Sequence, residues 1–143
     1  MGRKKGNCFQ AASSKIAFDR EFHIGHPDAV LVHAVVAGTG TLRGINVLHA
    51  WVEDRGIAYD CANGKELVIS VDLYRAIGKP SVEHRYTREQ AREALRTTGH
   101  YGPWHKDFDE QIRKKTEAEL LRRKTKPLTK TDDLGIDSVG EGL

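Results

Sequence analysis

Three residues of this sequence carry side chains that together can attack and transfer an acyl group. Cys8 lies at the start of a predicted helix, His49 lies within a predicted strand, and Asp60 follows the next turn. A thiol becomes an effective nucleophile when a base lies within hydrogen-bond reach, and that base needs an acceptor that orients its ring. The sequence therefore predicts a catalytic triad of Cys8, His49 and Asp60 that uses no metal ion and no cofactor.

The position of Cys8 favours a reactive thiol. Residues 7–18 predict a helix in which Asn7 is the N-cap and Gln10 occupies the capping-box position. The first turn of a helix has unpaired N–H groups and the positive end of the helix dipole, and both favour a thiolate over a thiol. The alternative is a packed residue, because free cysteine is among the most buried residue types.

The strand predicted for residues 46–53 places His49 and Trp51 on one face, because alternate residues of a strand share a side. The opposite face, with Leu48, Ala50 and Val52, is wholly apolar and is expected to face the main core. The mixed side with His49 is expected to face the first helix and a cleft. The alternative for His49 is a histidine at the edge of the core that is bonded to a backbone carbonyl.

The turn after this strand decides whether Asp60 meets His49. A two-residue turn at residues 54–55 places Asp60 directly opposite His49, where a carboxylate can hold the imidazole tautomer. A three-residue turn with Gly56 in the left-handed conformation places Cys61 there instead, unless a bulge restores the register. Gly56 favours the second turn, because the first demands a positive φ from an arginine.

These features resemble the transglutaminase-like superfamily, which shares a core with papain-like cysteine peptidases. The resemblance covers about residues 6–62, and the pentapeptide His-Ala-Trp-Val-Glu is similar to the histidine strand of small peptidases that clip leader peptides. It implies that Cys8 is the nucleophile, His49 the general base and acid, and Asp60 the orienting acid. Phe9 stands where family members often carry Trp, and no glutamine precedes the cysteine to form an oxyanion hole.

Other groups must therefore stabilise the oxyanion and orient the triad. The backbone N–H of Cys8 and the side chain of Asn7 are candidate oxyanion donors, and Asn63 is an alternative orienting group for the imidazole. The candidate positioning residues are Asn7, Gln10, Trp51 and Asn63. The implied substrate is a protein, a peptide or another amide, since peptide hydrolysis, glutamine deamidation and transamidation share these steps.

The remaining pattern predicts an α+β fold, in which an N-terminal helix packs on a small antiparallel sheet and helices follow at the C-terminal end. Residues 29–38 predict a strand that is buried on both faces, and residues 19–28 predict a loop. A single transglutaminase-like domain is expected over residues 6–124, followed by a disordered tail over residues 125–143. The irregular segment at residues 100–105 is expected to cover the core or to line a cleft.

Composition excludes several classes of protein. The 143 residues contain no apolar run near the roughly 20 residues that a membrane helix needs, so no membrane partner is expected. The basic start lacks the apolar stretch of a signal peptide, so a cytoplasmic protein with two free cysteines is expected. His23 and His26 form a His-x-x-His pair without further ligands at coherent spacing, and no metal site is expected.

The net charge of +3 is mild, and much of the basic excess lies in residues 113–126. A charged helix of this kind is usually a solvated face. Its basic end is also suited to contact nucleic acid or an acidic partner. The alternative function is therefore a non-catalytic regulatory or accessory domain that binds a macromolecule, and the oligomeric state stays open.

Overall fold

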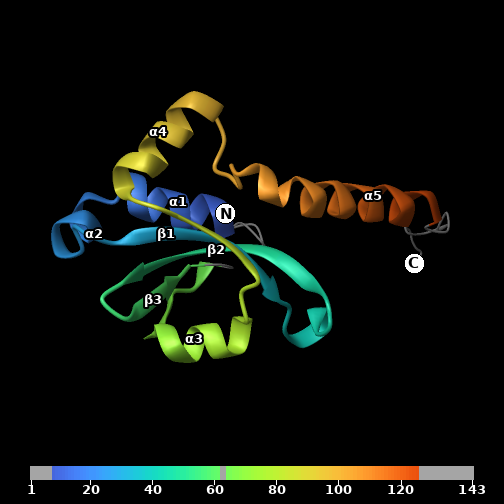
Figure 1. Ribbon diagram of the computed structural model, residues 1–143, viewed down its shortest axis with the longest axis horizontal. Coiled ribbons are helices and arrows are strands. Elements are labelled where there is room, and N and C mark those ends of the chain that lie inside the picture. The colour runs from blue at the N-terminus through green and yellow to red at the C-terminus, as the bar shows by residue number, and fades with distance from the viewer. Residues whose placement is uncertain (1–7, 62–63, 126–143) are drawn as a thin grey trace, which may run out of the picture. The chain divides into compact units, whose positions relative to one another are not determined.

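The computed structural model describes residues 8–61 and 64–125 of the chain (Figure 1). The chain divides into two compact units, residues 1–109 and 110–143, and each is described by itself. The domain predicted for residues 6–124 spans this division. The predicted tail lies outside the described residues from position 126 onward.

The α+β class predicted from the sequence is confirmed. Five strands form one antiparallel sheet in the order β4-β3-β2-β1-β5, with helices at both ends of the chain. The elements are α1 (Cys8–Phe18), α2 (Arg20–Gly25), β1 (Val30–Ala37), η1 (Gly40–Leu42), β2 (Asn46–Asp54), β3 (Ile57–Asp60), β4 (Leu67–Ser70), α3 (Val71–Gly78), β5 (Val82–Tyr86), α4 (Arg88–Thr98), η3 (Lys106–Phe108) and α5 (Asp109–Thr125).

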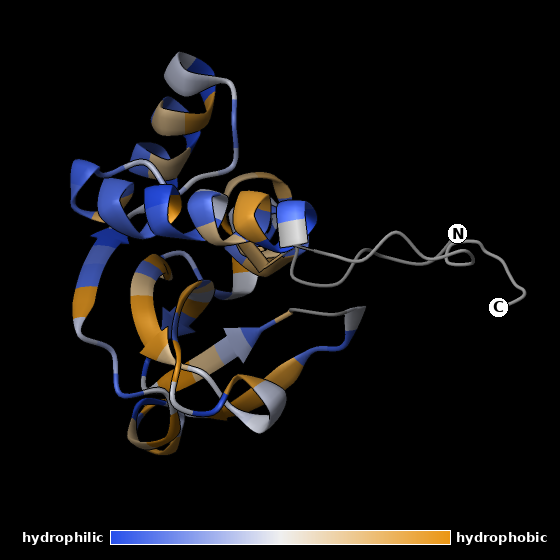
Figure 2. Ribbon diagram, turned by 90° about the vertical axis from the view of Figure 1, so that its right-hand side faces the viewer, coloured by the Kyte–Doolittle hydropathy of each residue, from blue (hydrophilic) through white to orange (hydrophobic). Residues whose placement is uncertain are grey.

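Helices cover both faces of the sheet, with α1 and α4 on one side and α3 on the other (Figure 1). On the first side, Ile16 of α1 and Ala91 of α4 pack against Ala50 and Val52 of β2. This confirms that the apolar alternation of β2 faces a core. Hydrophobic residues gather in the sheet, as Figure 2 shows, because the central strands are covered on both faces.

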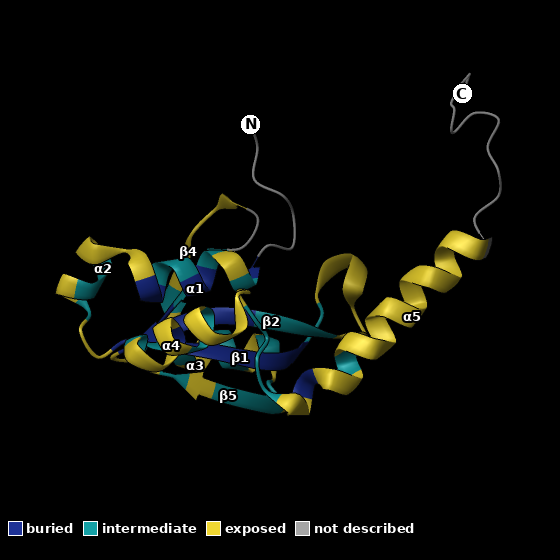
Figure 3. Ribbon diagram, turned by 90° about the horizontal axis from the view of Figure 1, so that it is seen from above, coloured by how far each residue is buried: buried dark blue, intermediate teal, exposed yellow. Residues whose placement is uncertain are grey.

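The second core lies between the sheet and α3. Trp51 of β2 and Ala58 of β3 are fully buried there, and Tyr74 of α3 packs against them. Strand β1 contributes to both cores, and its burial on both faces confirms the prediction for residues 29–38 (Figure 3). The side chains of β1 and β2 are therefore held from two directions, which gives the residues they carry little freedom to move.

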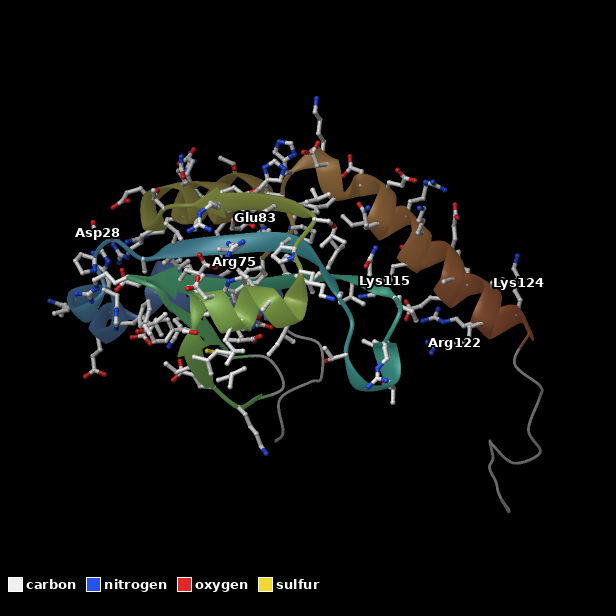
Figure 4. The ribbon with its side chains drawn as sticks, turned by 60° about the horizontal axis from the view of Figure 1, so that its bottom comes forward. Asp28, Arg75, Glu83, Lys115, Arg122 and Lys124 are labelled. Atoms are coloured by element: carbon white, nitrogen blue, oxygen red, sulfur yellow. The ribbon has the colours of Figure 1, made fainter. Side chains whose placement is uncertain are left out.

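A buried carboxylate fixes α3 against the sheet. Glu53 of β2 accepts hydrogen bonds from the Trp51 indole at 2.8 Å and from the Arg75 guanidinium at 3.0 Å. Both terminal nitrogens of Arg75 also donate hydrogen bonds to Glu83 of β5, each at 2.7 Å. Figure 4 labels these two side chains. The charge of Glu53 is thus compensated although its side chain is almost fully enclosed.

The prediction of a loop over residues 19–28 is wrong, because helix α2 lies within this segment. Asp19 caps this helix by accepting a hydrogen bond from the Phe22 N–H at 2.9 Å, and the Phe22 side chain packs on the first core. His26, which follows the helix, bonds Asp54 at the end of β2, with 2.6 Å between Nδ1 and Oδ2. Burial of an aromatic residue stabilises a helix that is too short to form alone.

The turn between β2 and β3 differs from both predicted turns. Pairing of Val52 with Tyr59 leaves Arg55 and Gly56 as a two-residue loop, and both have a positive φ, 47° and 82°. The guanidinium of Arg55 donates to Asp54 and to the Gly25 carbonyl, each at 2.9 Å, which compensates the strained arginine backbone. The register is therefore shifted by one or two residues from the predicted alternatives.

The segment at residues 100–105 covers the first core, as the first of its two predicted roles requires. The Tyr101 carbonyl accepts a hydrogen bond from Ser13 of α1 at 2.9 Å, and Trp104 packs against the core. A Cβ atom at Gly102 would lie 2.6 Å from the ring of His33, so only glycine permits this approach.

Helix α5 begins at Asp109 and is exposed along nearly all of its described length (Figure 3). Several of its charges are paired within the helix, such as Arg113 with Glu117 at 2.7 Å. None of the helices in the described part of the chain is long and apolar enough to cross a membrane.

Candidate active site

Cys8 is the first residue of α1, as the sequence predicts, and only 6% of its surface is exposed. It is free, and so is the half-buried Cys61, which confirms that the two thiols are not bridged. The predicted N-cap Asn7 lies outside the described residues.

His49 lies on the side of β2 that faces α3, where its Nε2 lies 3.0 Å from the Tyr74 hydroxyl. Of the first helix, which this side was expected to face, Cys8 at the start of α1 also acts on the ring. The ring stacks on Trp51, with centroids 5.9 Å apart. Alternation along the strand puts both residues on the α3 side, because Ala50 between them packs toward α1.

Asp60 meets His49 although the two residues are not directly opposite. Its Oδ2 lies 2.7 Å from Nε2 of His49. The register of β2 and β3 pairs Val52 with Tyr59, and one step further it sets Asp60 opposite Trp51. Since His49 lies two residues before Trp51 on the same face, Asp60 is its diagonal neighbour. Long side chains can bridge such a diagonal. The predicted partner is therefore the right one, and the predicted register is not.

Cys8 lies close enough to His49 to raise the pKa of the imidazole through hydrogen bonding and charge. Strand β3 pairs with β2 only at Val52–Asp54, so the edge of β2 beside His49 has no strand partner on that side among the described residues.

The surroundings of His49 favour its charged form. Burial is the largest single influence and lowers the pKa, but hydrogen bonds and charge from Asp60 and Cys8 together raise it to about 10. The ring is therefore protonated at neutral pH. An imidazolium beside a thiol stabilises the thiolate.

Tyr74 is a site residue that the sequence did not reveal. Its hydroxyl donates a hydrogen bond to Oδ2 of Asp60 and lies 3.0 Å from Nε2 of His49. Burial and the nearby charge of Asp60 raise the pKa of this phenol well above its usual range, so it remains a donor. No spacing rule links a tyrosine in α3 to two residues on neighbouring strands, and only the fold brings them together.

Replacing Tyr74 with phenylalanine should lower the free energy of unfolding by about 1.5–3 kcal/mol, because Asp60 loses a donor to its charged oxygen. Urea unfolding followed by circular dichroism measures the change. Tyr101→Phe is the matched control, since this tyrosine is exposed, and it should change stability by less than about 0.5 kcal/mol. Equal effects of the two variants would contradict the assignment of Tyr74.

The other candidate positioning residues have different environments. Trp51 is fully buried and its N–H donates to Glu53, so it supports the ring of His49 and is not free to bind an oxyanion. Gln10 is exposed on α1. Asn63, the alternative orienting group, lies outside the described residues. Asp60 itself bonds the imidazole of His49.

A groove runs along the exposed side of α1 and begins at Gln10, two residues after Cys8. Cys61, which follows Asp60, also lines it. The groove is lined by Gln10, Ala11, Ser14, Lys15, Phe18, Asp19 and Cys61. It therefore combines an apolar ring with charges of both signs close to the end of β3.

Comparison with protein-family models, with curated proteins and with solved structures finds no match to this chain. The chemistry of the site must therefore be judged from its own geometry.

Proposed function

We propose that the protein is a cysteine-dependent amide hydrolase or acyltransferase in which Cys8, His49 and Asp60 act as a triad. One observation carries this proposal. The three side chains come from α1, β2 and β3. Asp60 is hydrogen-bonded to His49, and Cys8 lies close enough to raise the pKa of the same ring. A nucleophile, a base within its reach and an acceptor that orients the base are the parts that covalent acyl transfer needs.

In the first step, the Cys8 thiolate attacks the carbonyl carbon of an amide, and the carbonyl electrons move onto oxygen. The backbone N–H at the start of α1 is the candidate donor to this oxyanion. Collapse of the intermediate breaks the C–N bond, and His49 gives its proton to the leaving amine. In the second step, water or an amine attacks the thioester, His49 takes up a proton, and the thiolate is regenerated.

The raised pKa of His49 suits this sequence of proton transfers. Part of the rise comes from Cys8 itself. Once sulfur is bonded to the acyl carbon, it carries no negative charge and that part is lost. The imidazolium then becomes a stronger acid at the moment when the leaving amine needs a proton.

Labelling with iodoacetamide at neutral pH tests the nucleophile. We expect alkylation of Cys8 to be at least about tenfold faster than alkylation of a free thiol, because the neighbouring imidazolium favours the thiolate. Peptide mapping by mass spectrometry assigns the label. Cys8→Ala should remove the fast phase and keep the circular dichroism spectrum of the native chain.

Cys61→Ala is the matched control, because burial and the neighbouring Glu66 raise the pKa of the Cys61 thiol. This variant should keep the fast phase. A native protein whose Cys8 reacts at the rate of a free thiol, or whose fast phase is lost in Cys61→Ala, would exclude Cys8 as the nucleophile.

The alternative function, a domain that binds a macromolecule through its basic last helix, has less support. The described part of α5 carries acidic as well as basic residues, and several of them are paired with one another. The transglutaminase-like core, the substrate class and the cytoplasmic location remain predictions.

A further inference from the structure

A second cluster of reactive side chains lies at the other edge of the sheet. It consists of His84 on β5, with His105 and Asp107 at the start of η3. Nε2 of His84 lies 2.8 Å from Oδ2 of Asp107, and Nδ1 of His105 lies 3.4 Å from the same oxygen. The triad chemistry uses none of these residues.

The two imidazole rings lie face to face, with centroids 3.6 Å apart and an angle of 15° between their planes. A neutral imidazole is the form that binds a metal ion. The Asp107 carboxylate oxygen, which lies near one nitrogen of each ring, completes a set of nitrogen and oxygen ligands that zinc prefers.

The spacing of the donor atoms agrees with one shared ion. One ligand atom from each residue lies within 4.8 Å of the others. Bonds of about 2.0–2.2 Å to a tetrahedral zinc ion place its ligand atoms roughly 3.3 Å apart. Small rotations of the exposed Asp107 and the half-buried histidines are enough to bring the three donors to that separation.

The backbone beneath the cluster is already fixed. Phe108, which follows Asp107, is fully buried, and its ring packs edge-on against His84 at 5.4 Å. The three residues therefore need little ordering when an ion binds. Binding through Nδ1 of His105 replaces one exposed hydrogen bond, which this nitrogen accepts from the Asp107 N–H at 3.0 Å.

We propose that His84, His105 and Asp107 bind a divalent transition-metal ion of the zinc type. Three protein ligands leave at least one coordination position to water, as in open zinc sites. The ion links β5 to the segment that leads into α5. This proposal is independent of the proposed acyl transfer, since the two sites share no residue.

Titration of the full reduced chain with Zn²⁺ tests the proposal. Calorimetry at pH 7.5 should give one ion per chain, and the ring Cε1–H signals of His84 and His105 should shift in the nuclear magnetic resonance spectrum. Asp107→Asn, His84→Ala and His105→Ala should each weaken binding at least tenfold. Asp107 is exposed, so the asparagine variant keeps the fold even if a histidine variant does not.

His23→Ala is the matched control, because it removes a histidine that lies on α2, away from the cluster, and should leave the affinity unchanged. Native affinity in Asp107→Asn and His84→Ala would overturn the proposal. Loss of zinc binding in Cys8→Ala alone would also overturn it, because the ion would then lie at the thiol.

Discussion

Replacing His49 with alanine should slow alkylation of Cys8 by at least about tenfold at neutral pH, because the imidazolium that favours the thiolate is removed. With a true amide substrate the loss should be larger, about 10²–10⁴-fold, since His49 also protonates the leaving amine. Stopped labelling reactions analysed by mass spectrometry measure the first effect.

His23→Ala serves as the control for His49→Ala, because this histidine lies on α2 and takes no part in the triad. Asp60→Asn gives a second comparison. It keeps the shape of the side chain and removes its charge, so labelling should slow less than in His49→Ala. If His49→Ala folds and its Cys8 is alkylated at the native rate, the base assigned to this site is wrong.

The same histidine makes stability depend on pH in the alkaline range. The pKa of His49 is about 10 in the folded protein and near 6.5 in an unfolded chain. A raised pKa contributes stability that is fully present below pH 6.5 and is lost as the pH rises toward 10. Unfolding in urea at pH 7 and pH 9.5 should show this loss in the native chain, with a smaller loss in His49→Ala.

Replacing His33 with leucine should remove a large part of the acid sensitivity of the fold. His33 lies on β1 with no exposed surface, and neither ring nitrogen has a hydrogen-bond partner. The rings of Phe9, Tyr86 and Trp104 surround it. A protonated ring at this position would be a buried charge without compensation.

Burial, followed by the nearby charge of His84, lowers the pKa of His33 to about 3. Between pH 6.5 and 3 the unfolded chain therefore binds a proton that the folded protein does not bind. The free energy of unfolding therefore decreases as the pH is lowered through this window. The decrease is about 1.4 kcal/mol for each pH unit once His33 of the unfolded chain is fully protonated.

Urea unfolding at pH 4.5 and pH 7, with a chelator present to keep metal from His84, measures this dependence. Leucine has nearly the volume of histidine and no polar atoms, so His33→Leu should be as stable as the native chain or more stable at neutral pH. Its stability should fall less on acidification. His23→Ala, at a position that is not fully buried, should keep the native pH dependence, and an unchanged dependence in His33→Leu would contradict the assignment.

Local pattern in the sequence predicted most of the elements. The capping box of Thr87 and Gln90 and the left-handed Gly99 define α4 as expected, because a cap depends only on residues within one helical turn. The apolar run of β1 and the alternation of β2 predicted strands in the right places. Helix α2 was missed, because its stability comes from packing of Phe22 and not from its own sequence.

The sequence by itself determined which residue types are present for chemistry, and where Cys8 lies on its helix. Only the tertiary structure decided that Asp60 reaches His49 along a diagonal, that Tyr74 joins them, and that α3 covers their side of the sheet. Strand register depends on the turn, and a single residue of difference changes which face each side chain occupies. The positive φ of Arg55 belongs to the two-residue turn with Gly56, and the bonds of its side chain to Asp54 and Gly25 are contacts that local sequence patterns do not reveal.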